Sequence, residues 1–151
     1  MKISTRGRYG LKVVVDIAQY TTPQARCVSL KSSSERLGIS ENYLEQIVAP
    51  LKKADILKSV RGAGGGYYLS RPAEELTVGE ILRILEGSLA PTDCAAGDSD
   101  GCGDSDCAGC PSKAVWTSLF ENINNVVDNI TINDLLKNFG DERKDFTNDI
   151  S

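Results

Sequence analysis

Four cysteines lie close together in one short stretch, DCAAGDSDGCGDSDCAGCP, over residues 93–111. Cys94, Cys102, Cys107 and Cys110 are separated by seven, four and two residues, and no large apolar side chain lies among them. Because such a loop cannot anchor itself in a hydrophobic core, the bonds of a metal centre could organise it instead. The stretch therefore predicts a thiolate-bound metal site.

The spacing of the cysteines favours some metal centres over others. Cys102 to Cys110 follow the C-x4-C-x2-C spacing of plant-type ferredoxins, which favours a 2Fe-2S cluster over 4Fe-4S. A four-cysteine zinc site fits the same spacing, and Asp93 or Asp106 could replace one thiol as a ligand. The remaining cysteine, Cys27, lies in an apolar stretch and is expected to be buried and unreactive.

Neither an enzyme nor a membrane protein is expected. The chain has no histidine, and no nucleophile lies beside an evident base. No apolar run approaches the roughly 18 residues that cross a bilayer, and the opening MKISTRGRYG lacks the apolar segment of a signal peptide. We therefore expect a cytoplasmic protein, where thiols stay reduced and clustered cysteines favour metal binding or redox sensing over disulfides.

Charge is divided unequally along the chain. Residues 1–72 hold 12 Lys and Arg against 5 Asp and Glu, a net charge of +7, whereas residues 73–151 hold 5 against 16, a net charge of −11. A basic unit joined to an acidic remainder is typical of a domain that binds nucleic-acid phosphates. A solvated basic face without a partner would carry the same charge, so charge alone does not choose between them.

The basic unit contains a helix-turn-helix pattern. Its predicted elements are a helix from Ser4 or Thr5 to about Tyr20, a short strand over residues 27–30, a brief helix that ends at Gly38, and a helix over residues 41–54. Ser40 caps the last helix, and Pro50 is expected to kink or loosen it. In such a pattern the first turns of the second helix reach base edges.

A glycine-rich hairpin follows these helices. In ILKSVRGAGGGYYLS, alternating residues lead to Arg61, the glycine-rich tip covers residues 62–66, and Tyr67 begins the returning strand. Helix-turn-helix plus hairpin is a winged helix, and the glycines would let Arg61 enter a narrow minor groove. A nucleotide-binding loop is excluded, because a helix should follow it and a strand follows here.

The rest of the chain leads to a long helix. Thr77 and Glu80 form a capping box before a connecting helix that Gly87 ends. Ser112 is expected to cap a helix over residues 113–130 whose apolar residues alternate steps of three and four: Trp116, Leu119, Ile123, Val126 and Ile130. At roughly 30 Å this helix is long for so small a core, which favours a homodimer seam over packing on its own domain.

The expected fold class is mostly α with a small β-wing, a winged helix-turn-helix plus a long C-terminal dimerisation helix. Its expected parts are a DNA-binding region over residues 1–72, a connecting helix over 73–92, the cluster-binding loop over 93–111, the dimerisation helix and a short following helix over 112–139, and a disordered tail over 140–151.

The order of these parts and their residues resemble one family. The segments STRGRYGLKVVVDIA, SERLGISENYLEQIVAPLKKADIL, SVRGAGGGYYLSRP, TVGEIL and CPSKAVW are similar to those of the iron-sulfur cluster regulator (IscR) family of winged-helix transcription factors, over about residues 1–135. The resemblance implies a homodimer, binding to dyad-symmetric promoter DNA, and control of that binding by an iron-sulfur cluster. It also implies cluster-biogenesis genes as targets and cluster-assembly proteins as donors.

The family's DNA contacts carry over to the second helix and the wing. These contacts are Ser40, Glu45, Gln46, Arg61 and Gly62, and Asn42 and Tyr43 on the same helix are also expected to bind DNA. A carboxylate such as Glu45 accepts a hydrogen bond from cytosine in the major groove but repels phosphate, so it can select among sites. A solvated helix face is the alternative interpretation.

The cluster ligands depart from the family pattern. Its members typically have three cysteines followed by a histidine, and Cys110 matches that histidine here. A fourth thiolate would lower the reduction potential relative to nitrogen ligation. The alternatives are a redox or nitric-oxide sensing repressor of the same family, a zinc-stabilised DNA-binding protein, and a partner-controlled module like the family's cysteine regulator, which lacks such a loop. An electron carrier would have no use for a wing.

Overall fold

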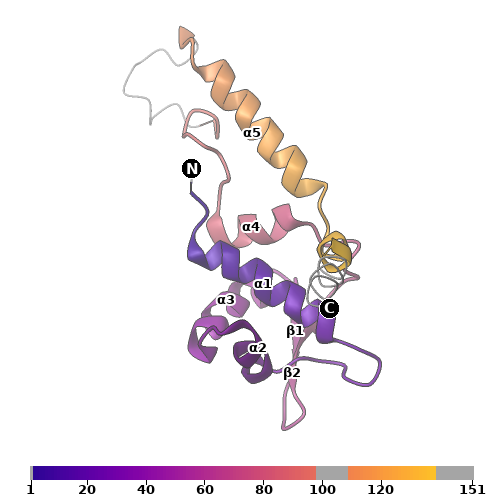
Figure 1. The fold of residues 1–151 in the computed structure, drawn as a ribbon. Coiled ribbons are helices and arrows are strands. Elements are labelled where there is room, and N and C mark those ends of the chain that lie inside the picture. Colours follow the sequence, from indigo (N-terminus) through magenta and orange to yellow (C-terminus); the bar gives the residue numbers. More distant parts are fainter. Residues whose placement is uncertain (1, 98–108, 139–151) are drawn as a thin grey trace, which may run out of the picture.

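The computed structural model describes residues 2–97 and 109–138. Its elements are α1 (Thr5–Tyr20), α2 (Leu30–Leu37), α3 (Glu41–Lys53), β1 (Leu57–Val60), β2 (Gly66–Leu69), α4 (Val78–Glu86) and α5 (Lys113–Asp128), and residues 132–138 are also helical. The predicted fold class is confirmed. Figure 1 shows α1 to α4 and the hairpin as one body from which α5 projects. Cys102, Cys107, Asp106 and the predicted tail over 140–151 lie outside the described residues.

Capping residues set the ends of the first helices, as the sequence predicts. The Ser4 hydroxyl accepts the N–H of Gly7 at 3.2 Å, and the Ser29 hydroxyl accepts that of Ser32 at 3.2 Å. Gly38 ends α2 in the left-handed conformation, with φ of 68°, which costs glycine little. The turn between α2 and α3 therefore begins at Gly38, because glycine adopts this left-handed conformation without strain.

The predicted strand over residues 27–30 is wrong in extent. Val28 forms a single antiparallel bridge with Tyr67, through hydrogen bonds of 2.8 Å in both directions, and Leu30 already belongs to α2. Ser29 is the N-cap of that helix, so its capping bond ends the extended segment after one bridge.

The second helix of the motif continues past its proline. Leu44, Ile47, Val48 and Leu51 are buried along one side of α3, and α-helix extends from Pro50 to Lys53 without the predicted loosening. Pro50 lies in the last turn, where the Ala54 N–H still donates to its carbonyl at 3.0 Å. Pro50 removes one backbone hydrogen bond, and only three helical residues follow it, so any distortion is confined to the last turn.

The wing is a two-stranded antiparallel hairpin with Leu57 opposite Leu69 and Val60 opposite Gly66. Arg61 therefore lies in the tip, whereas Gly66, predicted to be part of the tip, begins the second strand. A Cβ at position 66 would overlap the Val28 carbonyl. Glycine is needed there because the bridging segment approaches so closely.

A single main core holds the winged helix together. Its fully buried large residues come from α1, α3, β1, α4 and the segments after the wing and after α5: Ile17, Leu44, Ile47, Leu51, Leu57, Leu76, Ile81 and Ile132. Ile132 comes from the chain after α5, and its N–H donates to the Leu76 carbonyl at 2.8 Å. The base of α5 is therefore fixed to the body. None of the described helices is long and apolar enough to cross a membrane.

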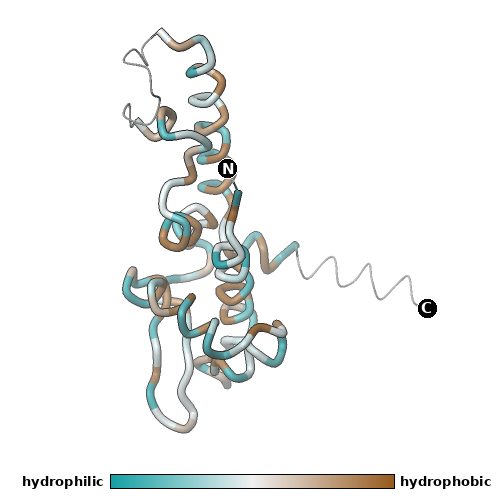
Figure 2. The backbone as a smooth tube through the Cα atoms, turned by 90° about the vertical axis from the view of Figure 1, so that its left-hand side faces the viewer, coloured by the Kyte–Doolittle hydropathy of each residue, from teal (hydrophilic) through white to brown (hydrophobic). Residues whose placement is uncertain are grey.

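The predicted apolar seam of α5 is divided between two faces. Ile123 and Ile130 pack, with Phe120 and Val127, against Val78, Leu82 and Leu89 of the same chain. Leu119 and Val126 are instead 42% and 58% exposed, together with Val115 at 59%. The three- and four-residue spacing in the sequence cannot tell these two faces apart, because residues of both faces lie within one broad apolar arc of the helix. Figure 2 shows apolar and polar residues alternating along this helix above the body.

Candidate nucleic-acid interface and cysteine site

The outer side of α3 is held rigidly by its buried side. Ser40 is its N-cap, and the serine hydroxyl accepts the Tyr43 N–H at 3.3 Å. Asn42, Glu45 and Gln46 are exposed in the first two turns. A helix fixed by an apolar side and polar at its N-terminal end matches a recognition helix that reads base edges in the major groove.

Tyr43 differs from its neighbours because it is half-buried. Its ring packs edge-on against Tyr9 of α1, with centroids 5.9 Å apart and planes at 83°, and the Lys12 ammonium lies 5.5 Å from the Tyr9 ring centre. Edge-to-face aromatic pairs favour this geometry. Tyr43 thus joins α3 to α1 in addition to lying beside the exposed polar residues.

An ion pair between buried Asp16 of α1 and partly exposed Arg36 of α2, which sequence reasoning missed, fixes α2 against α1. Asp16 is 6% exposed and accepts hydrogen bonds from the Ser33 hydroxyl at 2.6 Å and from Nε and Nη2 of Arg36 at 2.8 Å each. The hydrogen bond to Asp16 raises the pKa of Arg36, whose guanidinium also lies 4.0 Å from the Tyr20 ring centre. The sequence signal that could have predicted this contact is an aspartate, Asp16, on the apolar side of the first helix.

The wing tip presents a cation beside a glycine. Arg61 and Gly62 are exposed, and Gly62 has φ of 110°, a conformation that favours glycine. Cys27 is half-buried, not buried as predicted, and its thiol donates to the Gly64 carbonyl at 3.2 Å. Because Val28 pairs with Tyr67 of the second wing strand, the preceding residue, Cys27, lies beside the wing tip.

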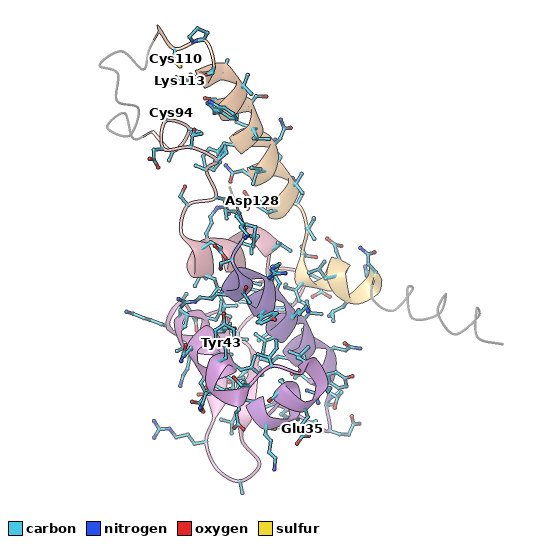
Figure 3. All side chains as sticks on the ribbon, turned by 60° about the vertical axis from the view of Figure 1, so that its left-hand side comes forward. Glu35, Tyr43, Cys94, Cys110, Lys113 and Asp128 are labelled. Atoms are coloured by element: carbon cyan, nitrogen blue, oxygen red, sulfur yellow. The ribbon has the colours of Figure 1, made fainter. Side chains whose placement is uncertain are left out.

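The two described cysteines of the loop lie at the end of the molecule where α5 starts (Figure 3). Figure 3 shows Cys94 and Cys110 near the start of α5, distant from Tyr43. Both are half-buried. The Cys94 sulfur lies 3.1 Å from the Thr92 hydroxyl, and the Cys110 sulfur lies 3.2 Å from the Ser112 hydroxyl. Ser112 therefore contacts a thiol and makes no capping bond to α5.

The described cysteines Cys94 and Cys110 offer sulfur donors for the predicted metal site. Within residues 2–97 and 109–138, no group of three or more Cys, His, Asp or Glu side chains is assembled, and Asp93 is exposed. Two half-buried thiols, each next to a hydroxyl, fit a thiolate-bound centre whose sulfurs accept hydrogen bonds. The assignment of Cys102 and Cys107 as further ligands rests on their sequence spacing.

Comparisons with known proteins give a consistent result. Residues 3–138 match the Rrf2 family model, described as an iron-dependent transcriptional regulator. The HTH-type transcriptional regulator CymR of Bacillus subtilis is 37% identical over 136 residues, covering 89% of each chain. The HTH-type transcriptional regulator IscR of Vibrio campbellii is 36% identical over 140 residues, covering 91% of this chain and 78% of the relative.

Solved structures agree with these matches. The structure of CymR, the global cysteine regulator of B. subtilis, superposes with a TM-score of 0.74 at 35% identity, covering 91% of this chain and 97% of that chain. The structure of IscR from T. potens gives a TM-score of 0.71 at 42% identity, covering 91% and 88%.

Proposed function

Because this chain belongs to the Rrf2 family of transcriptional regulators, we propose that it is a homodimer whose binding to dyad-symmetric promoter DNA is controlled by an iron-sulfur cluster. The observation that carries the DNA-binding part is the placement of exposed Glu45 and Gln46 on a rigid helix next to a wing that ends in exposed Arg61. The genes of cluster biogenesis are the proposed targets. Such a regulator acts in the cytoplasm and receives its cluster from assembly proteins.

The proposed DNA contacts have separate tasks. Ser40, Asn42, Tyr43, Glu45 and Gln46 would face the major groove, and Arg61 with Gly62 would enter the adjacent minor groove. Glu45 would choose among sites by accepting from cytosine, whereas Arg61 would respond to groove width and charge. The net charge of +7 over residues 1–72 favours this face for phosphate.

The proposed dimer contact is α5. This helix has no fully buried residue within one chain, and its exposed apolar residues are Val115, Leu119 and Val126. Burial of such a side chain is worth about 1.5–3 kcal/mol, so a second copy packed along this face would gain stability. A two-fold axis there would set two recognition helices a fixed distance apart, as a dyad-symmetric site requires.

The proposed cluster ligands are Cys94, Cys102, Cys107 and Cys110, with a 2Fe-2S cluster favoured by their spacing. When bound, the cluster supplies a centre that can gain or lose an electron and whose presence depends on iron. The loop is connected to the DNA-binding body through α4, which ends at Glu86, a few residues before the loop begins. Glu86 of α4 accepts hydrogen bonds from the Ser4 hydroxyl and from the Ser4 N–H at the start of α1, the latter at 3.0 Å.

Analysis of anaerobically isolated protein tests the cluster. We expect coloured protein with iron and sulfide in equal amounts, and loss of colour in each of the four single Cys→Ala variants. The matched control is Cys27→Ala, which should keep its iron because this thiol lies at the wing. Colourless protein with stoichiometric zinc would contradict the cluster and leave a zinc-stabilised regulator.

A cluster-free regulator is the second candidate, because CymR, a cysteine regulator, matches the chain as well as IscR does. Such a protein would respond to a partner or a small molecule. It would bind promoter DNA equally well before and after removal of iron by a chelator. Under the cluster proposal, the same treatment changes affinity or the choice of site.

A further inference from the structure

An open hollow lies between the end of α3 and the wing. Its volume is about 490 Å³, and the charged side chains that line it are Lys52 from the last turn of α3, Asp55 from the following turn, Lys58 from β1 and Arg61 from the tip. Tyr68, which pairs with Lys58 across the hairpin, also lines it. Cations from three separate elements are therefore gathered around one concave surface.

The charge of this hollow is not neutralised by ion pairs. The ion pairs found over residues 2–97 and 109–138 join Arg36 to Asp16, Arg71 to Glu80 and Arg83 to Asp128, and none includes Lys52, Lys58 or Arg61. All three cations are exposed. With Asp55 as the one acidic lining residue, the hollow keeps an excess of positive charge and can attract an anion.

The position of the hollow identifies the anion. Lys52 is seven residues after Glu45, so it lies on the same side of α3 about 10 Å further along the helix. Arg61 lies at the wing tip. If the start of α3 reads the major groove and the tip enters the adjacent minor groove, one sugar-phosphate strand must pass between them, because that strand separates the two grooves. Because residues from the end of α3 and from the tip line the hollow, that strand would pass along it.

We propose that Lys52 and Lys58 form a clamp for a DNA phosphodiester on the strand that runs between α3 and the wing. The clamp rests on the proposed DNA-binding function and adds to it a sequence-independent contact. Two ammonium groups from different elements hold one strand at a fixed place, and this sets the register in which Glu45 and Arg61 meet their grooves. Phosphate contacts position a protein on the duplex, whereas base contacts select the sequence.

Salt dependence of promoter binding tests the clamp. Lys52→Gln and Lys58→Gln should each weaken binding to all sequences equally. Each should also make the plot of log affinity against log salt shallower by about 0.9. Between 50 and 200 mM salt, the affinity ratio of wild type to each variant should therefore fall by about threefold. The matched control is Lys53→Gln, which removes the same charge from the next residue, outside the hollow. Its slope should equal that of the wild type.

Neutral phosphates locate the contact. When methylphosphonates replace single phosphates along the site, one or two neighbouring positions should weaken wild-type binding but leave the Lys52→Gln, Lys58→Gln double variant unaffected. The clamp is overturned if the double variant keeps the wild-type slope, or if Lys53→Gln changes it equally. It is also overturned if inorganic phosphate competes at constant ionic strength, since a small-anion site would then be present. Wild-type protein that binds no promoter duplex would instead contradict the proposed function.

Discussion

Arg83 of α4 and Asp128 of α5 are joined by two hydrogen bonds, from Nη1 to Oδ1 at 2.6 Å and from Nη2 to Oδ2 at 3.0 Å. Arg83 also donates to the Asn124 side chain at 2.8 Å. A Cβ on Gly79 would overlap Asp128, so glycine allows the two helices to come this close. This pair is the polar link between the DNA-binding body and the helix proposed to form the dimer.

The link should stabilise the protein in a pH-dependent way. The hydrogen bond from Arg83 lowers the pKa of Asp128 below its usual value of 3.8. A lowered carboxyl pKa stabilises the folded state above the unfolded pKa, and this contribution is lost as pH falls through the folded value. Because the two side chains are 39% and 45% exposed, we expect Arg83→Gln to cost about 0.5 kcal/mol at pH 7.

Thermal unfolding at several pH values checks this expectation. The difference between wild type and Arg83→Gln should be constant from pH 7 to about pH 5 and should shrink below about pH 4. Glu121→Gln is the control, because Glu121 is exposed on the same helix and outside the ion pairs found over the described residues. A difference that persists unchanged at pH 2 would contradict an ionic origin.

Arg36→Ala should destabilise the winged helix far more than an ordinary surface substitution. The substitution removes both hydrogen bonds from Arg36 to the Asp16 carboxylate, which is 6% exposed. The bond from the Ser33 hydroxyl remains. Because Arg36 itself is partly exposed, with 29% of its side chain accessible, the cost is that of leaving a buried charged acceptor without its main partner, about 2 kcal/mol. Urea unfolding at fixed protein concentration measures the loss. Lys31→Ala, an exposed change on the same helix, should stay close to wild type. An Arg36→Ala loss as small as the Lys31→Ala loss would show that the bond to Asp16 adds little stability.

Glu45→Ala should change which sequences are bound more than how tightly they are bound. Removal of the carboxylate takes away an acceptor for cytosine and a repulsion toward other bases. We expect discrimination at one or two base pairs per half-site to fall by about 1–3 kcal/mol. Sequencing of bound DNA from a random library measures it, with Glu41→Ala on the same helix as the control. An unchanged sequence preference would remove Glu45 from base reading.

Arg61→Ala should weaken binding to every site. The side chain is exposed at the wing tip, where a cation would lie in the narrow minor groove. We expect a loss of affinity at all sequences and a salt dependence shallower by about 0.9. Fluorescence anisotropy with specific and unrelated duplexes measures both. Undiminished affinity would place the wing outside the contact surface.

Leu119→Glu should prevent dimer formation while the winged helix stays folded. Leu119 is 42% exposed in the single chain, and a carboxylate there would have to be buried without a partner in the dimer. The control is Asn125→Glu, at an exposed position about a quarter turn away from this face. Analytical ultracentrifugation should show a monomer for Leu119→Glu and a dimer for the control. A dimeric Leu119→Glu protein would exclude this face from the contact.

The local structure was predictable from the sequence because its causes are local. Ser4, Ser29 and Ser40 cap the helices that follow them, and Gly38 ends α2, because a side-chain oxygen or a missing Cβ acts on backbone within four residues. The capping box of Thr77 and Glu80 is present with both of its bonds. These signals, with the glycine-rich hairpin, were enough to predict the winged helix.

Only the tertiary structure decided which residues meet across long separations in the chain. Val28 pairs with Tyr67, Asp16 with Arg36, and Arg83 with Asp128. The same packing directed Ile123 toward α4 and left Leu119 and Val126 exposed. Periodicity shows that a helix has an apolar arc, but the partner that covers each part of the arc depends on where the other elements pack. The clustering of the four cysteines was evident from their spacing in the sequence. That Cys94 and Cys110 lie far from Tyr43 of the recognition helix followed from the projection of α5 (Figure 3).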